Sequence, residues 1–261
     1  MTVILAKKMA LALLVGCLLV GSSFGWGQTG HRVVGQIAAW HLNKKAQRAL
    51  EQLLGSESLP MVSNWMDEIK SDPDYRFMDP WHYLTVKTGG GYDPSLQEAG
   101  GDAFSQTKKI ISALSDGNLD TEAKIEYVKM LVHLVGDLHQ PLHVGTGEDR
   151  GGNEVKVTYF NQPTNLHAVW DTRIIAGKEL SYTELAEHLN RRASTERIRS
   201  YQSDPMEKWL QEAVDLRPLI YDLPEDKRLF YEYGYRCFPV IEERLLAGGI
   251  RLAGILNELF G

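Results

Sequence analysis

Apolar residues recur at helical spacing along most of this chain. Four stretches show the pattern, at residues 29–54, 121–138, 181–189 and 239–259. Positions three and four residues apart lie on one face of an α-helix, so each stretch predicts a helix that buries an apolar stripe. The pattern therefore predicts a mainly α-helical protein.

Strand-like alternation is confined to one stretch, GGNEVKVTYF at residues 151–160. There Val155, Val157 and Tyr159 alternate with polar residues, which is typical of a half-buried strand. We therefore expect a short β-hairpin at this point. Two glycine-rich stretches, at residues 89–94 and 145–152, predict exposed loops.

The N-terminal segment has the pattern of a secretory signal peptide, which we place at residues 1–25. Lys7 and Lys8 precede an apolar run, and small residues follow up to Gly25. The apolar run is shorter than the roughly 18 residues that a membrane-spanning helix needs. We therefore expect cleavage after Gly25, one mature domain at residues 26–261, a periplasmic or secreted protein, and no stable association with a membrane.

Cysteine content and charge narrow the class of protein further. Cys17 completes LVGC, a bacterial lipoprotein signal, so acylation at Cys17 is the alternative to cleavage after Gly25. After cleavage at Gly25 only Cys237 remains, and no internal disulfide can form.

The formal net charge of −6 excludes broad electrostatic attraction of nucleic acid, so a phosphate-bearing substrate has to be captured by a local site. We expect a monomer.

Candidate metal ligands are concentrated in the segment HLVGDLHQPLH. His133 and Asp137 are four residues apart there, which places both side chains on one face of a helix. His167 and Asp171 repeat the spacing in NLHAVWD, and His143 adds an imidazole. One such pair is as compatible with an ordinary role as with a metal site. The ordinary roles are a surface ion pair and a buried histidine held by a carboxylate. Two pairs together favour a metal site, and this donor set suits zinc better than calcium or magnesium.

Further positions are candidates for completing such a site. Asp67 in NWMDEIKSD has a helical context, and His82 follows a proline and a tryptophan in DPWHYL. Cleavage after Gly25 would expose the α-amino group of Trp26, whose ordinary pKa near 8 lets a metal displace its proton at neutral pH. His31 follows five residues later. Taken alone, Asp67 is better explained as a solvated helix carboxylate, and His82 is also compatible with a core residue in an aromatic cluster.

Six motifs follow one another along the chain, WGQTGHR, WMDEIK, PWHYL, HLVGDLHQPLH, GGNEVKV and NLHAVWD. Their order and spacing resemble those of the zinc-dependent single-strand-specific nucleases of the S1/P1 type. The resemblance extends from Trp26 to the C-terminal AGGIRLAGILNEL and covers essentially the whole mature chain. It implies a single-domain helical fold of the phospholipase C/nuclease type, with three zinc ions at the bottom of a cleft.

The resemblance also implies which residues bind each zinc ion. The first ion would be held by four side chains, Asp67, His82, His133 and Asp137. The second would be held by side chains of the later motifs, His143, His167 and Asp171. The third would take the α-amino nitrogen and carbonyl oxygen of Trp26, with His31 and Asp137, so that Asp137 bridges two ions.

The activity that the resemblance implies is hydrolysis of single-stranded RNA and DNA to products with a 5′-phosphate, with 3′-nucleotidase activity as a further option. Asp67, Asp137 and Lys70 would take part in catalysis. Lys70 stands where the family commonly has arginine, and it offers phosphate a point charge without a bidentate fork. Tyr83 would stack on a base and Asn153 would contact the substrate.

Two other classes of protein use residues of the same kind. A zinc-dependent phospholipase C would apply this chemistry to lipid headgroups, but that branch carries glutamate where this chain has Asp171. A non-catalytic zinc protein would have closed, single sites. His41, His139 and His188 match none of the implied ligands, and we expect structural roles for them.

Overall fold

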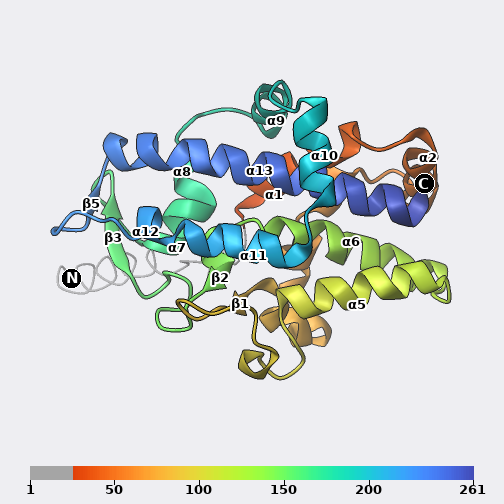
Figure 1. The fold of residues 1–261 in the computed structure, drawn as a ribbon, viewed down its shortest axis with the longest axis horizontal. Helices are drawn as coiled ribbons and strands as arrows, with labels where there is room; N and C mark the ends of the chain where they lie inside the picture. Colours follow the sequence, from red (N-terminus) through yellow and green to blue (C-terminus); the bar gives the residue numbers. More distant parts are fainter. Residues whose placement is uncertain (1–25) are drawn as a thin grey trace, which may run out of the picture.

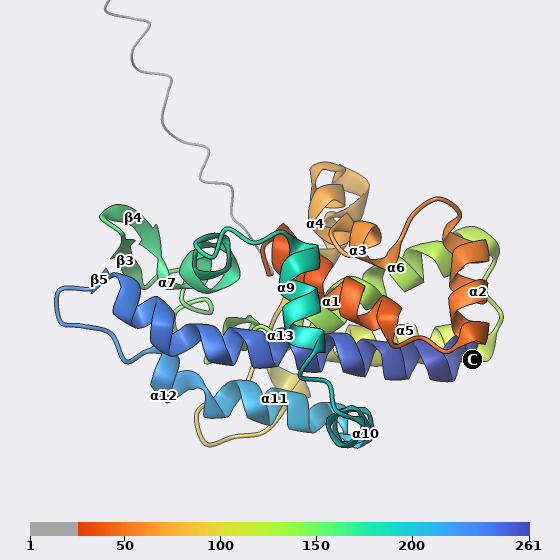
Figure 2. The ribbon, with the colours of Figure 1, turned by 90° about the horizontal axis from the view of Figure 1, so that it is seen from above.

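One long helix organises the computed structural model, which describes residues 26–261; the expected signal peptide and Cys17 lie outside the described residues. This helix, α13 (Tyr231–Phe260), runs along the length of the molecule (Figure 1). α1 (Gln28–Trp40) packs on one side of α13, and α11 (Met206–Asp215) runs along its other side (Figure 2). α5 (Ala103–Asp116) pairs with α6 (Thr121–Asp137), and α6 also contacts α1 and α13.

Shorter helical segments connect these helices and cover the core between them. The α-helical ones are α2 (Lys44–Leu54), α3 (Leu59–Val62), α4 (Trp65–Glu68), α7 (Leu166–Ala168), α8 (Ile174–Ala176), α9 (Tyr182–Asn190), α10 (Thr195–Ser203) and α12 (Arg217–Ile220). The 3₁₀-helical ones are η1 (Ile69–Ser71), η2 (Pro73–His82), η3 (Pro94–Leu96) and η4 (Pro141–His143), and η5 (Val169–Arg173) is a π-helix.

The mainly α-helical class that the sequence predicts is confirmed. Residues 121–138 form α6 and residues 181–189 form α9, each to within a residue or so at its ends. The start of α9 follows from its sequence, because Ser181 and Glu184 make a reciprocal capping box. No helix within residues 26–261 combines the length and the apolar character that crossing a bilayer requires.

Two predicted helix boundaries are wrong. Residues 29–54 form two helices, α1 and α2, because the Asn43 side chain accepts the amide N–H groups of Lys45 and Ala46 and starts a new helix there. α13 begins at Tyr231, and Pro239 lies inside it. A proline removes one helical hydrogen bond, but burial of a long apolar face keeps this helix continuous.

The predicted hairpin is confirmed as β3 (Lys156–Tyr159) paired antiparallel with β4 (Gln162–Asn165). Its turn residues Phe160 and Asn161 have φ of 49° and 63°, as a tight two-residue hairpin turn requires. A third strand, β5 (Arg228–Leu229), pairs parallel with β3. β1 (Leu84–Thr85) pairs parallel with β2 (Val144–Gly145), which joins the segment after His82 to the segment after His143.

Close approach between α1 and α6 depends on a glycine. A Cβ at Gly136 would lie only 2.6 Å from His31 Nδ1, so any larger residue would push the His31 ring away. α1 also lies close to α13, where a Cβ at Gly249 would lie 2.5 Å from Ile37 Cβ. These two crossings bring the functional residues of α1 and α6 into one buried layer.

Candidate metal centre and substrate cleft

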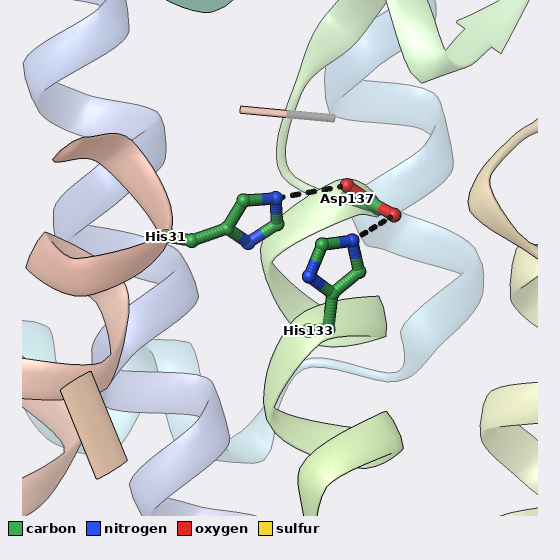
Figure 3. A group of neighbouring side chains, drawn as sticks. All are labelled: His31, His133 and Asp137. Atoms are coloured by element: carbon green, nitrogen blue, oxygen red, sulfur yellow. Dashed lines mark ion pairs between the residues drawn. The ribbon is translucent and has the colours of Figure 1, made fainter. Parts of the chain in front are cut away.

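The first side-chain group lies where α1 crosses the end of α6. His31 comes from α1, and His133 and Asp137 come from one face of α6, so both imidazoles converge on the same carboxylate (Figure 3). His31 Nε2 lies 3.3 Å from Asp137 Oδ1, and His133 Nε2 lies 3.2 Å from Asp137 Oδ2. The His31 and His133 rings stack with their centroids 3.9 Å apart. All three side chains are buried.

A second group shares His133 and adds residues from α4 and the end of η2. Asp67 Oδ1 lies 3.9 Å from both His82 Nδ1 and His133 Nε2. His82 Nδ1 is 3.0 Å from His133 Nε2 and also 3.0 Å from Asp137 Oδ2. Asp137 therefore contacts both groups, with Oδ1 toward His31 and Oδ2 toward His133 and His82.

A third group consists of His143, His167 and Asp171. His143 ends η4, His167 lies in α7, and Asp171 lies in the π-helical turn η5. Asp171 Oδ2 is 2.9 Å from His167 Nε2, and Asp171 Oδ1 is 3.9 Å from His143 Nε2. The three groups together contain all eight side chains that the sequence predicts as ligands: His31, Asp67, His82, His133, Asp137, His143, His167 and Asp171.

Backbone carbonyl groups orient three of these histidines. His133 Nδ1 donates to the Ser63 oxygen at 2.7 Å, and His143 Nδ1 donates to the His82 oxygen at 2.6 Å. His167 Nδ1 donates to the Gly151 oxygen at 2.7 Å. A proton on Nδ1 leaves Nε2 with a lone pair, which is the arrangement that metal-binding histidines use.

Several atoms of these groups are buried and have no hydrogen-bond partner within residues 26–261. They are both ring nitrogens of His31, Nε2 of His82, His143 and His167, Oδ1 of Asp137 and Oδ2 of Asp171. His31 Nε2 and His167 Nε2 lie close to the Asp137 and Asp171 carboxylates, but without the geometry of a hydrogen bond. Buried polar atoms without partners are costly, and so many in one place indicate a bound ion. Imidazole nitrogen and carboxylate oxygen are donors that zinc accepts at tetrahedral geometry, so the residues present fit zinc.

Burial lowers the pKa of His31, His82 and His143 in the direction that metal binding needs, whereas the carboxylates of Asp137 and Asp171 outweigh burial and raise the pKa of His133 and His167. Burial lowers the pKa of His82 to about 4, so its ring is neutral at neutral pH. Burial alone would raise the pKa of the Asp137 carboxyl, but His133 and His143 outweigh it and hold that pKa well below its usual range. A carboxylate with neutral imidazoles is the form that coordinates zinc.

The predicted N-terminal ligand, Trp26, also lies beside the groups. Its side chain is fully buried, and the amide N–H of Gly27 donates to the carbonyl oxygen of Asp171 at 2.9 Å. This bond ties the segment that begins at Trp26 to the third group. Coordination by the α-amino group of Trp26, and the assignment of ligands to individual ions, stay predictions.

A cavity of about 650 Å³ opens beside the third group and contains His143 and His167 in its lining. It also contains the three residues that the sequence predicts as substrate contacts, Lys70, Tyr83 and Asn153. Lys70 Nζ lies 2.7 Å from Asp67 Oδ1, which places its charge next to the second group. Tyr83 is 36% exposed, so its ring is accessible from the cavity.

Sequence reasoning missed three residues at this site. Arg76 and Arg150 line the cavity, but isolated arginines in loop-like sequence carry no distinguishing pattern. Gln140 donates to Asp171 Oδ1 and accepts the amide N–H of Leu142 at 2.6 Å. Its position inside the histidine-rich segment HLVGDLHQPLH could have indicated that Gln140 contacts a metal ligand.

The histidines expected to be structural have partners outside the three groups. His41 Nε2 bonds to Asn190 at 2.7 Å, and His188 lies 3.3 Å from Glu242. His139 is buried, with its Nδ1 donating to the Val135 oxygen at 2.7 Å.

Comparison with known proteins gives matches over nearly the full chain. The family profile described as S1/P1 Nuclease matches residues 26–261. Endonuclease 3 of Arabidopsis thaliana is 30% identical, over 95% of this chain and 94% of that protein. Nuclease S1 of Aspergillus oryzae is 29% identical, over 90% of this chain and 92% of that protein. Endonuclease 2 of Arabidopsis thaliana is 28% identical, over 91% of each.

Proposed function

The chain belongs to the S1/P1 nuclease family, and from this premise we propose that it is a zinc-dependent endonuclease that hydrolyses single-stranded RNA and DNA. The observation that carries the proposal is the set of buried, unpartnered nitrogen and oxygen atoms around Asp137 and Asp171, next to a cavity whose lining includes Lys70, Arg76 and Arg150. A bound cation accounts for these atoms, and the cavity offers room for a nucleotide. Family membership supplies the class of substrate.

The proposal of three zinc ions rests on the three side-chain groups. The third group, His143, His167 and Asp171, would hold one ion. The other two would share Asp137, with His31 and the Trp26 amine on one side and Asp67, His82 and His133 on the other. When bound, zinc lowers the pKa of coordinated water and neutralises negative charge on a phosphate.

The residues of the chain around the cavity would hold and orient the substrate. The Lys70 ammonium, beside Asp67, would attract a phosphate oxygen toward the ligand groups. The Tyr83 ring would stack on a base, and Asn153 would contact the same nucleotide. A base inside a duplex is already stacked on both faces, so stacking on Tyr83 favours single strands.

The finer features of the reaction follow from the same proposal. Water would add its oxygen to phosphorus, the bond from phosphorus to the ribose 3′-oxygen would break, and that oxygen would take a proton. The products would then carry a 5′-phosphate, and a 3′-nucleotide would be hydrolysed by the same displacement. The net negative charge of the chain agrees with capture of substrate at this local site.

The site of action and assembly state belong to the proposal as well. The signal-like sequence up to Gly25 supports a periplasmic or secreted protein that begins at Trp26, and we expect this protein to be a monomer. Acylation at Cys17 would instead tether the protein to a membrane. Mass spectrometry of the protein purified from its native compartment decides, because a start at Trp26 supports the proposal and a lipid on Cys17 contradicts it.

A matched pair of histidine variants tests the activity. Purified protein is incubated with a single-stranded oligonucleotide, with the same sequence as a duplex, and with phosphatidylcholine vesicles, before and after chelation and zinc replacement. We expect zinc-dependent cleavage of the single strand. His167→Gln should lose cleavage, because His167 belongs to the third group. His188→Gln should keep full cleavage, because His188 is exposed and pairs with Glu242. Hydrolysis of phosphatidylcholine without cleavage of the oligonucleotide would contradict the nuclease and indicate a phospholipase C.

A further inference from the structure

A buried cluster of charged residues packs against the turn that follows Asp137. Arg244 and Arg251 of α13 are 3% and 1% exposed, and His139 is fully buried beside them. Both arginines pair with Glu212 of α11. Buried ion pairs give little net stability, so their presence here calls for another reason.

The cluster completes the hydrogen bonds at the C-terminal end of α6. The last carbonyl groups of a helix have no partners within the helix, and here they are buried. His139 Nδ1 donates to the Val135 oxygen at 2.7 Å. Arg244 donates to the oxygens of His139 at 3.1 Å and of Leu138 at 3.3 Å. Arg251 donates to His139 Nε2 at 3.0 Å, which holds the ring in one orientation.

Charge gives a second reason for an arginine at this position. α6 ends at Asp137, and the carboxyl end of a helix carries partial negative charge. The guanidinium of Arg244, which donates to the Leu138 oxygen, places positive charge at this negative end of the helix, while His31, His133 and His82 face the Asp137 carboxylate itself.

The capped turn connects all three side-chain groups. Asp137, at its start, faces the first and second groups, and His143, at its end, belongs to the third. Between them, Gln140 donates to Asp171 and accepts the amide N–H of Leu142. A shift of this turn would therefore change the separation between ligands of different groups.

We propose that Arg244 is a positioning residue for the metal centre, because it caps α6 and holds the turn from Leu138 to His143 in the orientation that zinc binding needs. The inference deepens the proposed function and rests on it. Residues that hydrogen-bond directly to a metal ligand typically contribute about 10-fold to 100-fold to metal affinity. Arg244 bonds to the turn between the ligands and not to a ligand itself, so we expect loss of its guanidinium to accelerate zinc release by a smaller factor, up to about 10-fold.

The test measures zinc release directly, so it has a readout besides nuclease activity. Arg244→Met keeps the apolar stem, and Arg244→Lys keeps the charge but offers a single ammonium in place of the planar fork. Arg192→Met serves as control, because Arg192 likewise pairs with glutamates across a helix contact, Glu242 and Glu243 of α13, and its hydrogen bonds within residues 26–261 do not reach the turn. Each zinc-loaded protein is mixed with a colorimetric chelator at an equal interval below its own Tm.

We expect the fastest zinc release in Arg244→Met, intermediate release in Arg244→Lys and wild-type release in the control. Wild-type release from a folded Arg244→Met protein would overturn the inference. If Arg244→Met does not fold, Arg244→Lys decides, and wild-type release from it would have the same meaning. Absence of zinc from the wild-type protein would instead contradict the proposed function, so the two failures are distinguishable.

Discussion

Replacement of Gly136 by alanine tests how closely α1 and α6 must approach for the metal ligands to meet. The new Cβ would lie 2.6 Å from His31 Nδ1, whereas ordinary contact begins at 3.4 Å, so the ring has to move by about 0.8 Å. His31 Nε2 lies 3.3 Å from Asp137 Oδ1, and a shift of this size disrupts the group. A misplacement of about 1 Å costs on the order of 100-fold in rate, so we expect kcat/KM to fall by about this factor.

Folding stability should respond much less than activity to this substitution. Alanine gains about 1 kcal/mol over glycine within a helix, and overpacking costs roughly 1–3 kcal/mol. The zinc-free Gly136→Ala protein should therefore lose no more than about 2 kcal/mol in its free energy of unfolding. Urea unfolding of the zinc-free protein measures this quantity. A large loss of activity with a small loss of stability separates a displaced ligand from a disrupted core.

The assay compares hydrolysis of a single-stranded oligonucleotide with zinc content in Gly136→Ala and in a matched glycine variant. Gly254→Ala is the control, because a Cβ there lies within α13 and meets only the flexible side chain of Gln202, with Cγ at 3.0 Å. We expect the control to keep wild-type activity and zinc. Wild-type kcat/KM together with full zinc content in Gly136→Ala would refute the reasoning.

Three further predictions follow from the site and its surroundings. Asp137→Asn should abolish activity and lower zinc content, because one carboxylate faces two groups, and retention of three zinc ions per chain by atomic absorption would contradict this. Arg76 and Arg150 line the cavity, where they can bind phosphates that flank the cleaved bond. Arg76→Gln and Arg150→Gln should therefore raise KM for long oligonucleotides more than for dinucleotides. Equal effects on both substrates would refute this role. Burial, followed by the charges of two arginines, holds the pKa of His139 well below its usual value, so only the unfolded chain takes up its proton near pH 6.5. Stability should therefore fall as pH drops below about 6.5, by at most about 1.4 kcal/mol per pH unit from this group, and His139→Gln should remove that share in urea unfolding at pH 5 to 7.

Helices and pairs of ligands within one helical turn could be read directly from the sequence. The periodicity of residues 121–138 predicted α6, and the four-residue spacing of His133 and Asp137 predicted that both side chains share a face. Such statements depend only on the geometry of one helix. The division of residues 29–54 into α1 and α2 was missed, although Asn43 is a typical capping residue, because the apolar pattern continues across it.

Gathering of the three groups was expected only through the resemblance to a known family. Taken from their own sequence context, Asp67 and His82 were compatible with ordinary surface and core roles. The structure brings them to His133 through α4 and η2, two segments without a strong periodic signal. The parallel pairing of β1 with β2 then aligns the segment after His82 with the segment after His143.

Local elements, the class of chemistry and the candidate ligands could all be inferred from the amino-acid sequence, because residue type and short-range spacing are properties of the chain. Three contacts became visible only in the folded protein: His31 fits against Gly136, His139 turns away from the metal groups, and Arg244 caps α6 at Leu138 from a helix about 100 residues later. These contacts depend on how whole helices cross. A crossing is set by the packing of many side chains at once, so no local spacing reveals which distant residues it will bring together.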